Sequence, residues 1–280
     1  MSNPYIPMPM RVEKVITEVD TRDIKTFRLS FQREEDRDSF QFMPGQFCEL
    51  SVPGKGESPI GIASSPLERD YVEFTVMMAG VVTTELHSME PGDFMGIRGP
   101  LGNHYPLERL KGKNVVVVGG GFAFTTLRSL TRYMLHPDNR RDFADITVIY
   151  GARTPGLLLY KDELKTWMDR EDIRTHVTVD PPGAEGWEGH VGFVPTIVEQ
   201  VAPGAGESVA VVCGPPIMIR FTLPVLLKLG FAREDIVTSL EMRMKCGIGK
   251  CGRCNVGEKY VCLHGPVFTL AELDQLPSEY

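Results

Sequence analysis

Four of the six cysteines in this 280-residue chain lie within a short stretch near its C-terminal end. Their spacing is Cys246-x4-Cys251-x2-Cys254-x7-Cys262, and the first three members follow the plant-type spacing of [2Fe-2S] sites. Thiolates at this spacing hold iron in a cluster that exchanges single electrons. The stretch therefore predicts a [2Fe-2S] cluster bound by these four cysteines.

Three glycines, Gly247, Gly249 and Gly252, lie between the first and third cysteines. Glycine accepts positive φ angles and lets the backbone approach a ligand closely, so we expect N–H groups of this loop to point at the sulfurs. Such donors stabilise the negative charge of a cluster. The glycines support the same interpretation as the cysteine spacing.

Two other metal or redox sites could use the same residue type. A structural zinc site also takes four thiolates, but zinc ribbons usually present two Cys-x2-Cys pairs, and only Cys251 and Cys254 form one here. A redox disulfide would not need two further cysteines. Cys48 and Cys213 stand alone on apolar segments, so the cysteines do not form a disulfide framework, and we expect a reducing, cytoplasmic location.

A glycine triplet could bind a dinucleotide phosphate. Gly119, Gly120 and Gly121 directly follow the β-branched run of residues 115–118 and precede a segment with helical spacing of apolar residues. Backbone N–H groups at such a strand-to-helix turn can receive a pyrophosphate. The triplet is not the Gly-x-Gly-x-x-Gly fingerprint, however, and it could serve tight packing alone.

A cluster takes single electrons, whereas a nicotinamide delivers a hydride, so a chain with both sites needs a cofactor that splits electron pairs. Flavin is the usual mediator. Residues 80–84 offer backbone amides and hydroxyls for a second pyrophosphate, and the candidate residues there are Gly80, Val82, Thr83 and Thr84.

The pattern of apolar residues changes along the chain and predicts three parts. Residues 1–106 show short alternating strands separated by Pro-Gly turns, which indicates a closed antiparallel barrel. Residues 107–240 alternate buried strands with helices, which indicates a doubly wound α/β domain with a parallel sheet. Residues 241–280 form a small cysteine-containing lobe.

Composition excludes several classes of function. The formal net charge of −7 argues against a nucleic-acid surface, which needs clustered Lys and Arg. We expect no membrane span and no export signal, because the apolar runs are short and the N-terminal residues are polar or proline-rich. No Gly-x-Ser-x-Gly motif is present, and the six histidines show no spacing typical of a metal site.

The order of several motifs resembles the ferredoxin-NADP reductase superfamily, and within it the flavin and iron-sulfur subunits of sulfhydrogenases and anaerobic sulfite reductase. The dihydroorotate dehydrogenase electron-transfer subunit is similar too. The resemblance spans about residues 10–270. Its motifs are residues 43–47 (MPGQF), 99–103 (GPLGN), the glycine turn, 150–153 (YGAR), 160–164 (YKDEL), 213–218 (CGPPIM) and the cysteine lobe.

This resemblance implies FAD in the barrel and NAD(P)H on the α/β domain. Where many members have Arg-x-Tyr-Ser/Thr at the flavin, this chain has Ser58, Pro59, Ile60 and Gly61, so flavin binding is expected to depend on backbone groups and on Thr83 and Thr84. On the nicotinamide side the implied residues are the glycine triplet, Phe122, Arg153, Cys213, Gly214 and Pro215.

The first hypothesis is an electron-transfer subunit that moves electrons between NAD(P)H, FAD and the cluster. Its partners would be iron-sulfur and catalytic subunits of a larger complex, of the hydrogenase or sulfite reductase type. The second is a relay and docking subunit with flavin and cluster but no working nicotinamide site, because the turn at residues 119–126 departs from the family pattern. The third is a zinc-stapled flavoprotein that reduces a small molecule directly.

Overall fold

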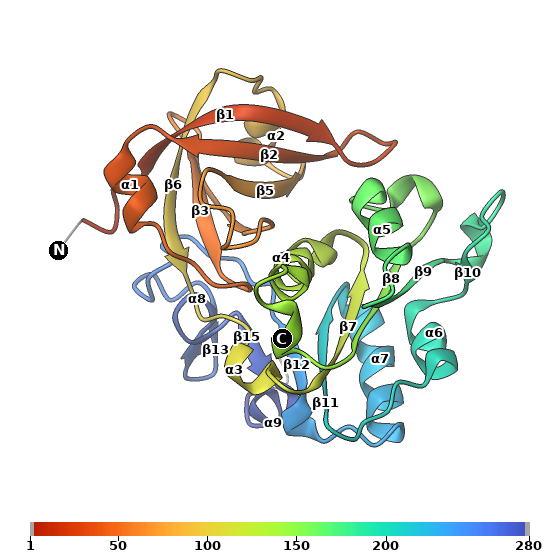
Figure 1. The fold of residues 1–280 in the computed structure, drawn as a ribbon. Helices are drawn as coiled ribbons and strands as arrows, with labels where there is room; N and C mark the ends of the chain where they lie inside the picture. The colour runs from red at the N-terminus through yellow and green to blue at the C-terminus, as the bar shows by residue number, and fades with distance from the viewer. Residues whose placement is uncertain (1–2, 278–280) are drawn as a thin grey trace.

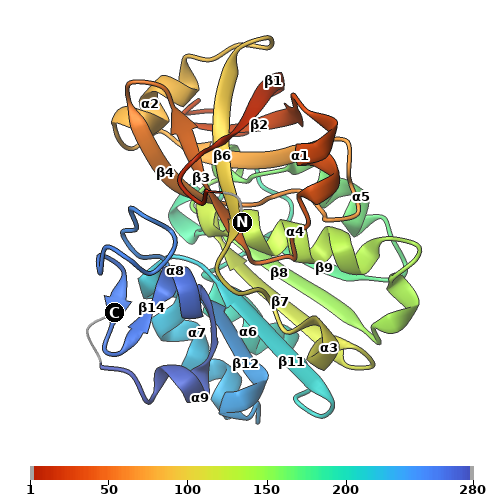
Figure 2. The same cartoon turned by 90° about the vertical axis from the view of Figure 1, so that its left-hand side faces the viewer.

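The computed structural model describes residues 3–277 and shows two β-sheet domains with a small lobe packed against both (Figures 1 and 2). No helix in that range is long and apolar enough to cross a membrane. The predicted fold class is confirmed, with one correction to the barrel.

The first domain is a six-stranded antiparallel sheet in the order β4-β3-β6-β1-β2-β5. Two short helices that the sequence pattern did not predict cover parts of it. The strands are β1 (Met8–Thr17), β2 (Ile24–Phe31), β3 (Phe47–Val52), β4 (Gly56–Gly61), β5 (Val72–Met77) and β6 (Phe94–Leu101), and the helices are α1 (Glu34–Ser39) and α2 (Val81–His87).

The expected closure of this barrel is wrong. Strands β4 and β5 are the two edges of the sheet, and only an isolated bridge between Ile62 and Phe74 joins them. Pro59 lies in β4 and has no N–H to donate to a second neighbour, which suits an edge strand. The sheet is therefore barrel-like but open along one seam.

The second domain has a seven-stranded sheet in the order β10-β9-β8-β7-β11-β12-β15, parallel except at β15. Its strands up to residue 240 are β7 (Asn114–Gly120), β8 (Ile146–Ala152), β9 (Arg174–Val179), β10 (His190–Val191), β11 (Ser208–Cys213) and β12 (Ile236–Ser239). Its helices are α3 (Leu107–Leu110), α4 (Phe124–Leu135), α5 (Lys161–Met168), α6 (Val194–Val201) and α7 (Pro216–Lys228). The predicted end of α7 at Gly230 is confirmed, since that glycine has φ +95°.

The cysteine lobe contributes one strand to this sheet. Strand β15 (Val267–Thr269) pairs antiparallel with β12, and α9 (Leu270–Leu273) packs beside it. The rest of the lobe is the hairpin β13 (Asn255–Val256) and β14 (Lys259–Tyr260), followed by α8 (Val261–His264). Figure 2 shows this part below the barrel and beside the α/β sheet. The lobe is thus fixed to the sheet through hydrogen bonds of its own backbone.

A buried ion-pair network holds the two domains together. Arg128 of α4 lies 2.8 Å from Glu73 of β5 and 2.7 Å from Glu163 of α5, and it also donates to the carbonyl of Ala63. Burial would raise the pKa of Glu73, but Arg128 and Arg28 outweigh it and lower that pKa. Strand β5 is buried on both faces because its second face meets the α/β domain.

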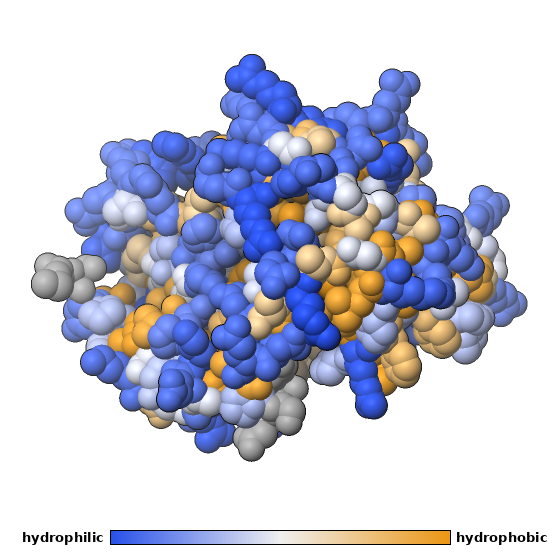
Figure 3. Space-filling model, turned by 90° about the horizontal axis from the view of Figure 1, so that it is seen from below, coloured by the Kyte–Doolittle hydropathy of each residue, from blue (hydrophilic) through white to orange (hydrophobic). Residues whose placement is uncertain are grey.

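Apolar side chains also reach the surface. In Figure 3 they gather in patches between hydrophilic residues on the face seen from below. Exposed examples elsewhere in the described chain include Ile217 and Phe221 on α7 and Leu263 on α8. Ile217 and Phe221 are four residues apart on one face of α7, whereas Leu263 lies on the cysteine lobe.

Replacing Arg128 with methionine is expected to lower the free energy of unfolding by about 3–5 kcal/mol, because Glu73 would keep a buried charge without its main partner. The matched control is Arg174→Met, which breaks the solvent-exposed pair with Asp145 and should change stability by no more than about 1 kcal/mol. Chemical denaturation followed by tryptophan fluorescence measures both. Equal effects of the two variants would contradict a supporting role for Arg128.

Candidate functional site

A hollow of about 250 Å³ lies where the barrel, the α/β domain and the start of the cysteine lobe meet. The barrel contributes Pro59, Ile60 and Gly61, and the α/β domain contributes Phe122 and Cys213. All five were candidates from the sequence, and the structure brings them together. Its wall is completed by Gly45, Phe47, Thr75, Ala123, Thr125, Thr126, Ser239, Leu240, Glu241, Met242, Met244 and Pro266.

The two domains touch directly at this hollow. A Cβ at Gly61 would collide with the methyl group of Thr126, so glycine there permits the close approach of β4 to α4. The hydroxyl of Thr126 lies 3.3 Å from the Tyr105 hydroxyl and points its proton at the sulfur of Cys213, 3.8 Å away. Burial raises the pKa of Cys213 to about 12, so its thiol stays neutral.

The hollow opens at the point where α/β sheets of this type bind ligands. Strand β7 lies between β8 and β11. The chain continues from β7 through β8, β9 and β10 on one side, and it then returns to build β11 and β12 on the other side. Ligands of open α/β sheets bind at such a switch point, outside the carboxyl ends of the strands. The glycine triplet, Arg153 and residues 213–215 all lie at or directly after carboxyl ends of strands in this sheet.

The three glycines of the turn play different parts. A Cβ at Gly119 would meet the ring of Phe124, and one at Gly120 would meet the sulfur of Met218, so both serve packing. Gly121 has φ +53° and open space where a Cβ would be. Ala123 lies in the turn at residues 119–126 and takes an ordinary right-handed conformation. The departure from the family pattern thus causes no backbone strain.

The other candidates lie outside the wall of the hollow. Thr83 caps α2: its hydroxyl oxygen accepts N–H groups of Ala79 and Gly80 at 2.9 and 2.8 Å. Thr84 is exposed near Gly80, and Val82 packs near the β3–β4 turn. Arg153 is exposed beside the turn at residues 181–183, where it lowers the pKa of Asp180 against the larger, raising effect of burial. Ser58 of β4 pairs with Leu50 of β3, and Gly214 and Pro215 begin the turn into α7.

Sequence reasoning missed Ser239 and Glu241. They follow the carboxyl end of β12, a strand that the sequence interpretation did not recognise. Had that strand been identified, its position in the sheet would have pointed to both residues. Desolvation in the hollow raises the pKa of Glu241.

Backbone N–H groups point at the cysteine sulfurs of the lobe, as predicted. Gly249 N–H donates to Cys262 Sγ at 3.2 Å, and Cys262 N–H donates to Cys254 Sγ at 3.4 Å. The N–H groups of Lys250 and Cys251 donate to Cys246 Sγ at 3.3 and 3.4 Å. This loop chemistry fits an anionic iron-sulfur group.

The predicted glycine conformations in this loop are confirmed, with φ near +68° at Gly247, Gly249 and Gly252. The N–H groups that point at the sulfurs come from the loop between Cys246 and Cys262 and from Cys262 itself. Between residues 3 and 277 no three His, Cys, Asp or Glu side chains stand around a point that would hold one metal ion.

Burial differs across the four cysteines. Cys254 and Cys262 are each 1% exposed and belong to an apolar core with Phe47 of β3. Cys251 is exposed, and Cys246 lies between these extremes. The lobe therefore has a buried side toward the barrel and an open side toward solvent.

The barrel holds the cysteine loop through Arg98 and Asn103. Arg98, which is 4% exposed, donates to the carbonyl of Cys246 at 3.1 Å and pairs with Glu57 at 2.7 Å. Asn103 donates to the carbonyls of His264 and Val267 at 3.0 and 2.7 Å and accepts the N–H of Val267.

Glu49 lies under this loop without a hydrogen-bond partner among the described residues. It is fully buried, and a Cβ at Gly247 would lie 3.4 Å from its carboxylate. Burial raises the pKa of Glu49 to about 7, although Arg98 acts in the opposite direction.

One pair of histidines is brought together by strand pairing that their spacing did not reveal. His176 Nδ1 lies 3.2 Å from His190 Nε2, across β9 and β10. The pair lies on the exposed edge of the sheet.

The fold and the two sites define an iron-sulfur flavoprotein of the ferredoxin-NADP reductase type. Three family profiles match in succession: the oxidoreductase FAD-binding domain at residues 12–105, the oxidoreductase NAD-binding domain at 117–223, and the iron-sulfur cluster binding domain of dihydroorotate dehydrogenase B at 241–274.

Curated relatives cover nearly the whole chain. Sulfhydrogenase 1 subunit gamma of Pyrococcus furiosus is 37% identical over 98% of this chain and 94% of its own length. A probable dihydroorotate dehydrogenase B (NAD(+)) electron transfer subunit of the same organism is 32% identical over 90% of this chain and 87% of its own. The chain belongs to the family of electron-transfer subunits that contains these proteins, within the ferredoxin-NADP reductase superfamily.

Solved structures show the same fold at lower identity. The NADH-dependent reduced ferredoxin-NADP oxidoreductase, studied for flavin-based electron bifurcation, aligns with TM-score 0.74 and 24% identity over 99% of this chain and 91% of that one. A ferredoxin NADP+ reductase from Neisseria gonorrhoeae with bound FAD and NADP aligns with TM-score 0.69 and 21% identity over 82% of this chain and 96% of that one. The chain is an electron-transfer subunit with FAD, NAD(P)H and iron-sulfur sites.

The raised pKa of Glu49 predicts a carboxylic acid that keeps its proton at about pH 6, where exposed carboxyls are ionised. The infrared difference between the wild-type chain and Glu49→Gln should show a carboxylic C=O band at that pH, and the band should fade as the pH rises through about 7. Because the folded chain binds this proton more tightly than the unfolded chain, the wild type should lose stability relative to Glu49→Gln between about pH 4.5 and 7. A carboxylate band at every pH would contradict this.

Proposed function

We propose that this chain is an NAD(P)H-dependent oxidoreductase subunit that passes electrons through FAD and a [2Fe-2S] cluster to or from a catalytic partner subunit. FAD would bind to residues 1–106, NAD(P)H to residues 107–240, and the cluster to residues 241–280. The matched FAD, NAD and iron-sulfur profiles fall within these three parts. The NAD-domain match and the open space at Gly121 favour a working nicotinamide site over the relay alternative.

One observation carries the proposal: the interdomain hollow and the core around two cluster cysteines share side chains. Phe47, Met242 and Met244 line the hollow and also pack in or against the core that contains Cys254 and Cys262. A ring held in the hollow would therefore lie one layer of side chains from the cysteines. When bound, flavin would accept the hydride of a nicotinamide and release its electrons singly.

The chain's own residues prepare this hollow for two stacked rings. Phe47, Ile60 and Phe122 give it apolar surfaces that exclude water. Cys213 presents a small neutral thiol at the carboxyl end of β11, held by the hydroxyl of Thr126. Hydride transfer depends on positioning more than on acid-base groups, so these contacts would orient the nicotinamide.

The cysteine loop supports the [2Fe-2S] assignment. In a two-iron cluster each iron takes two cysteines, so the four cysteines of this loop are the number of ligands required. The N–H donors to Cys246, Cys254 and Cys262 would offset the negative charge of the cluster. The partner is proposed to be a hydrogenase or a sulfite or sulfur reductase, because one relative is a sulfhydrogenase gamma subunit.

Anaerobic titration of the purified holoprotein with NADH and NADPH tests the function. We expect the flavin absorbance to bleach, a reduced-cluster signal to appear in electron paramagnetic resonance, and about two irons per chain. Cys251→Ser should lose iron but keep flavin reduction, whereas Cys48→Ala, in the barrel core, should keep both. Inertness to both nicotinamides would favour the relay subunit, and zinc in place of iron would favour the zinc-stapled flavoprotein.

Gly121→Ala is expected to raise the KM for NAD(P)H about tenfold, since a methyl group would enter the open space where the dinucleotide approaches. Gly112→Ala is the matched control: Gly112 also has positive φ and open space, but it precedes β7 at the opposite end of the strand. Both variants should lose about 1–2 kcal/mol of stability to backbone strain. Steady-state kinetics with either nicotinamide would separate them, and an unchanged KM in Gly121→Ala would place the dinucleotide elsewhere.

A further inference from the structure

Basic residues surround the cysteine loop of an otherwise acidic chain. Residues 243–259 contain five basic side chains and one acidic one, whereas the whole chain has a net charge of −7. A basic residue directly precedes each of the first three cysteines: Lys245, Lys250 and Arg253. We call these three, together with Arg243 and Lys259, the basic rim.

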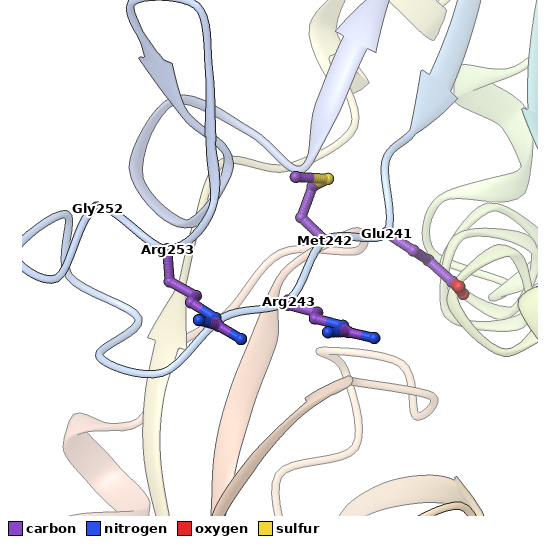
Figure 4. Close-up of a pocket in the computed structure, with 5 residues that line it drawn as sticks. All are labelled: Glu241, Met242, Arg243, Gly252 and Arg253. Atoms are coloured by element: carbon purple, nitrogen blue, oxygen red, sulfur yellow. The ribbon is translucent and has the colours of Figure 1, made fainter. Parts of the chain in front are cut away.

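Every residue of the basic rim is exposed. None of the five lies in an ion pair with another residue of the described range 3–277, although ion pairs are frequent elsewhere on the surface. Figure 4 shows Arg243 and Arg253 on neighbouring segments of the lobe, with their side chains extending into one hollow that both residues line. This second hollow is distinct from the interdomain hollow but shares Glu241 and Met242 with it, and Gly252 completes its lining. Glu241 forms no ion pair with either arginine, so the two positive charges have no partner among the described residues.

Three residues of the basic rim directly precede cysteines of the site. Cys251 is exposed between Lys250 and Arg253, whereas Cys254 and Cys262 are buried. Leu263 is 55% exposed beside this loop, where a Cβ at Gly249 would lie 3.1 Å from its side chain. An apolar centre inside a charged rim is the ordinary composition of a protein–protein interface.

Five unpaired cations close to one another repel, and they gain most from a surface of opposite charge. A nucleic acid or an anionic membrane would also supply negative charge. The net charge of −7 disfavours both, because an extended polyanion would meet the acidic remainder of the chain. A compact acidic protein can contact the rim alone.

We propose that the basic rim is the docking surface for an acidic face of a protein that holds a one-electron acceptor. Docking there would place the acceptor next to Cys251, the exposed end of the cysteine site. In each transfer one electron leaves the reduced cluster and reduces the acceptor by one electron, with no proton or bond change. The inference rests on the proposed function, since it assumes a cluster at the four cysteines.

Binding of a purified acidic ferredoxin to the immobilised holoprotein tests the docking surface, with both proteins oxidised and no nicotinamide present. Affinity should fall as salt rises, because screening shortens the Debye length to about 10 Å at 0.1 M. The triple variant Lys245→Gln, Lys250→Gln, Arg253→Gln should bind about tenfold more weakly, as expected for the loss of three charge contacts. Basic cytochrome c can meet only the acidic remainder of the chain, so it should bind the triple variant no more weakly than the wild type.

The matched control removes the same charge elsewhere. Lys14, Arg141 and Lys165 are exposed and lie in no ion pair with a described residue, so their triple glutamine variant should keep affinity within about twofold. The double variant Arg243→Gln, Lys259→Gln changes two rim residues that are not adjacent in sequence to any cysteine, and it should still weaken binding. Iron analysis of each variant shows whether the cluster is retained. If the triple variant loses iron, the affinity of the double variant tests the docking surface instead.

Cross-linking locates the contact. A carbodiimide couples lysine amines to carboxylates in direct contact, so peptides containing Lys245 or Lys250 should become joined to the ferredoxin. Lys245→Arg with Lys250→Arg should keep the affinity and lose those cross-links. Equal weakening by the rim and control triples, cross-links only to lysines outside the basic rim, or tighter binding of an oligonucleotide or an anionic vesicle would overturn the proposal. Failure of nicotinamide to reduce the flavin would contradict the proposed function without affecting this result.

Discussion

The fixed contact between the barrel and the α/β domain is the constraint on which the rest of the structure depends. Arg128 is the centre of that contact, because its guanidinium joins β5, α4 and α5 while almost wholly buried. Gly61, which has no side chain, lets β4 approach Thr126 closely, and Thr126 lies on α4 near Arg128. The interdomain hollow exists only while these surfaces remain together, so the relative position of two rings bound there is set by the domain contact.

The lobe is hydrogen-bonded to both domains. Strand β15 extends the α/β sheet through β12, and Arg98 and Asn103 hold the cysteine loop to the barrel. The contact between the two domains and the contact between the barrel and the lobe each contain a buried glutamate, Glu73 and Glu49, and the pKa values of these two carboxyls shift in opposite directions. Arginines surround Glu73 and keep it ionised, whereas Glu49 has no hydrogen-bond partner in the described chain and burial raises its pKa.

Local patterns in the sequence predicted the two-domain fold, the α/β alternation and the cysteine loop, because strand periodicity, helix periodicity and short spacings are local properties. Contacts between distant segments were not predictable in the same way. Barrel closure failed because the edges β4 and β5 meet only at Ile62 and Phe74. Glu241 was missed because strand β12 was not recognised, and the ion pairs of Arg128 were missed because Glu73 and Glu163 lie in other parts of the chain. The glycine triplet was ambiguous until packing showed that Gly119 and Gly120 contact side chains while Gly121 does not.

The difference in burial across the four cysteines gives the lobe a direction. Cys254 and Cys262 face the core that contains Phe47, which also lines the interdomain hollow. Cys251 faces solvent among unpaired basic residues. Electron tunnelling weakens steeply with distance, so a bound cluster would couple to the flavin side through the buried pair and to a partner through the exposed cysteine. The same short loop, closed by glycines with positive φ, therefore provides one contact toward the interior and another toward the surface.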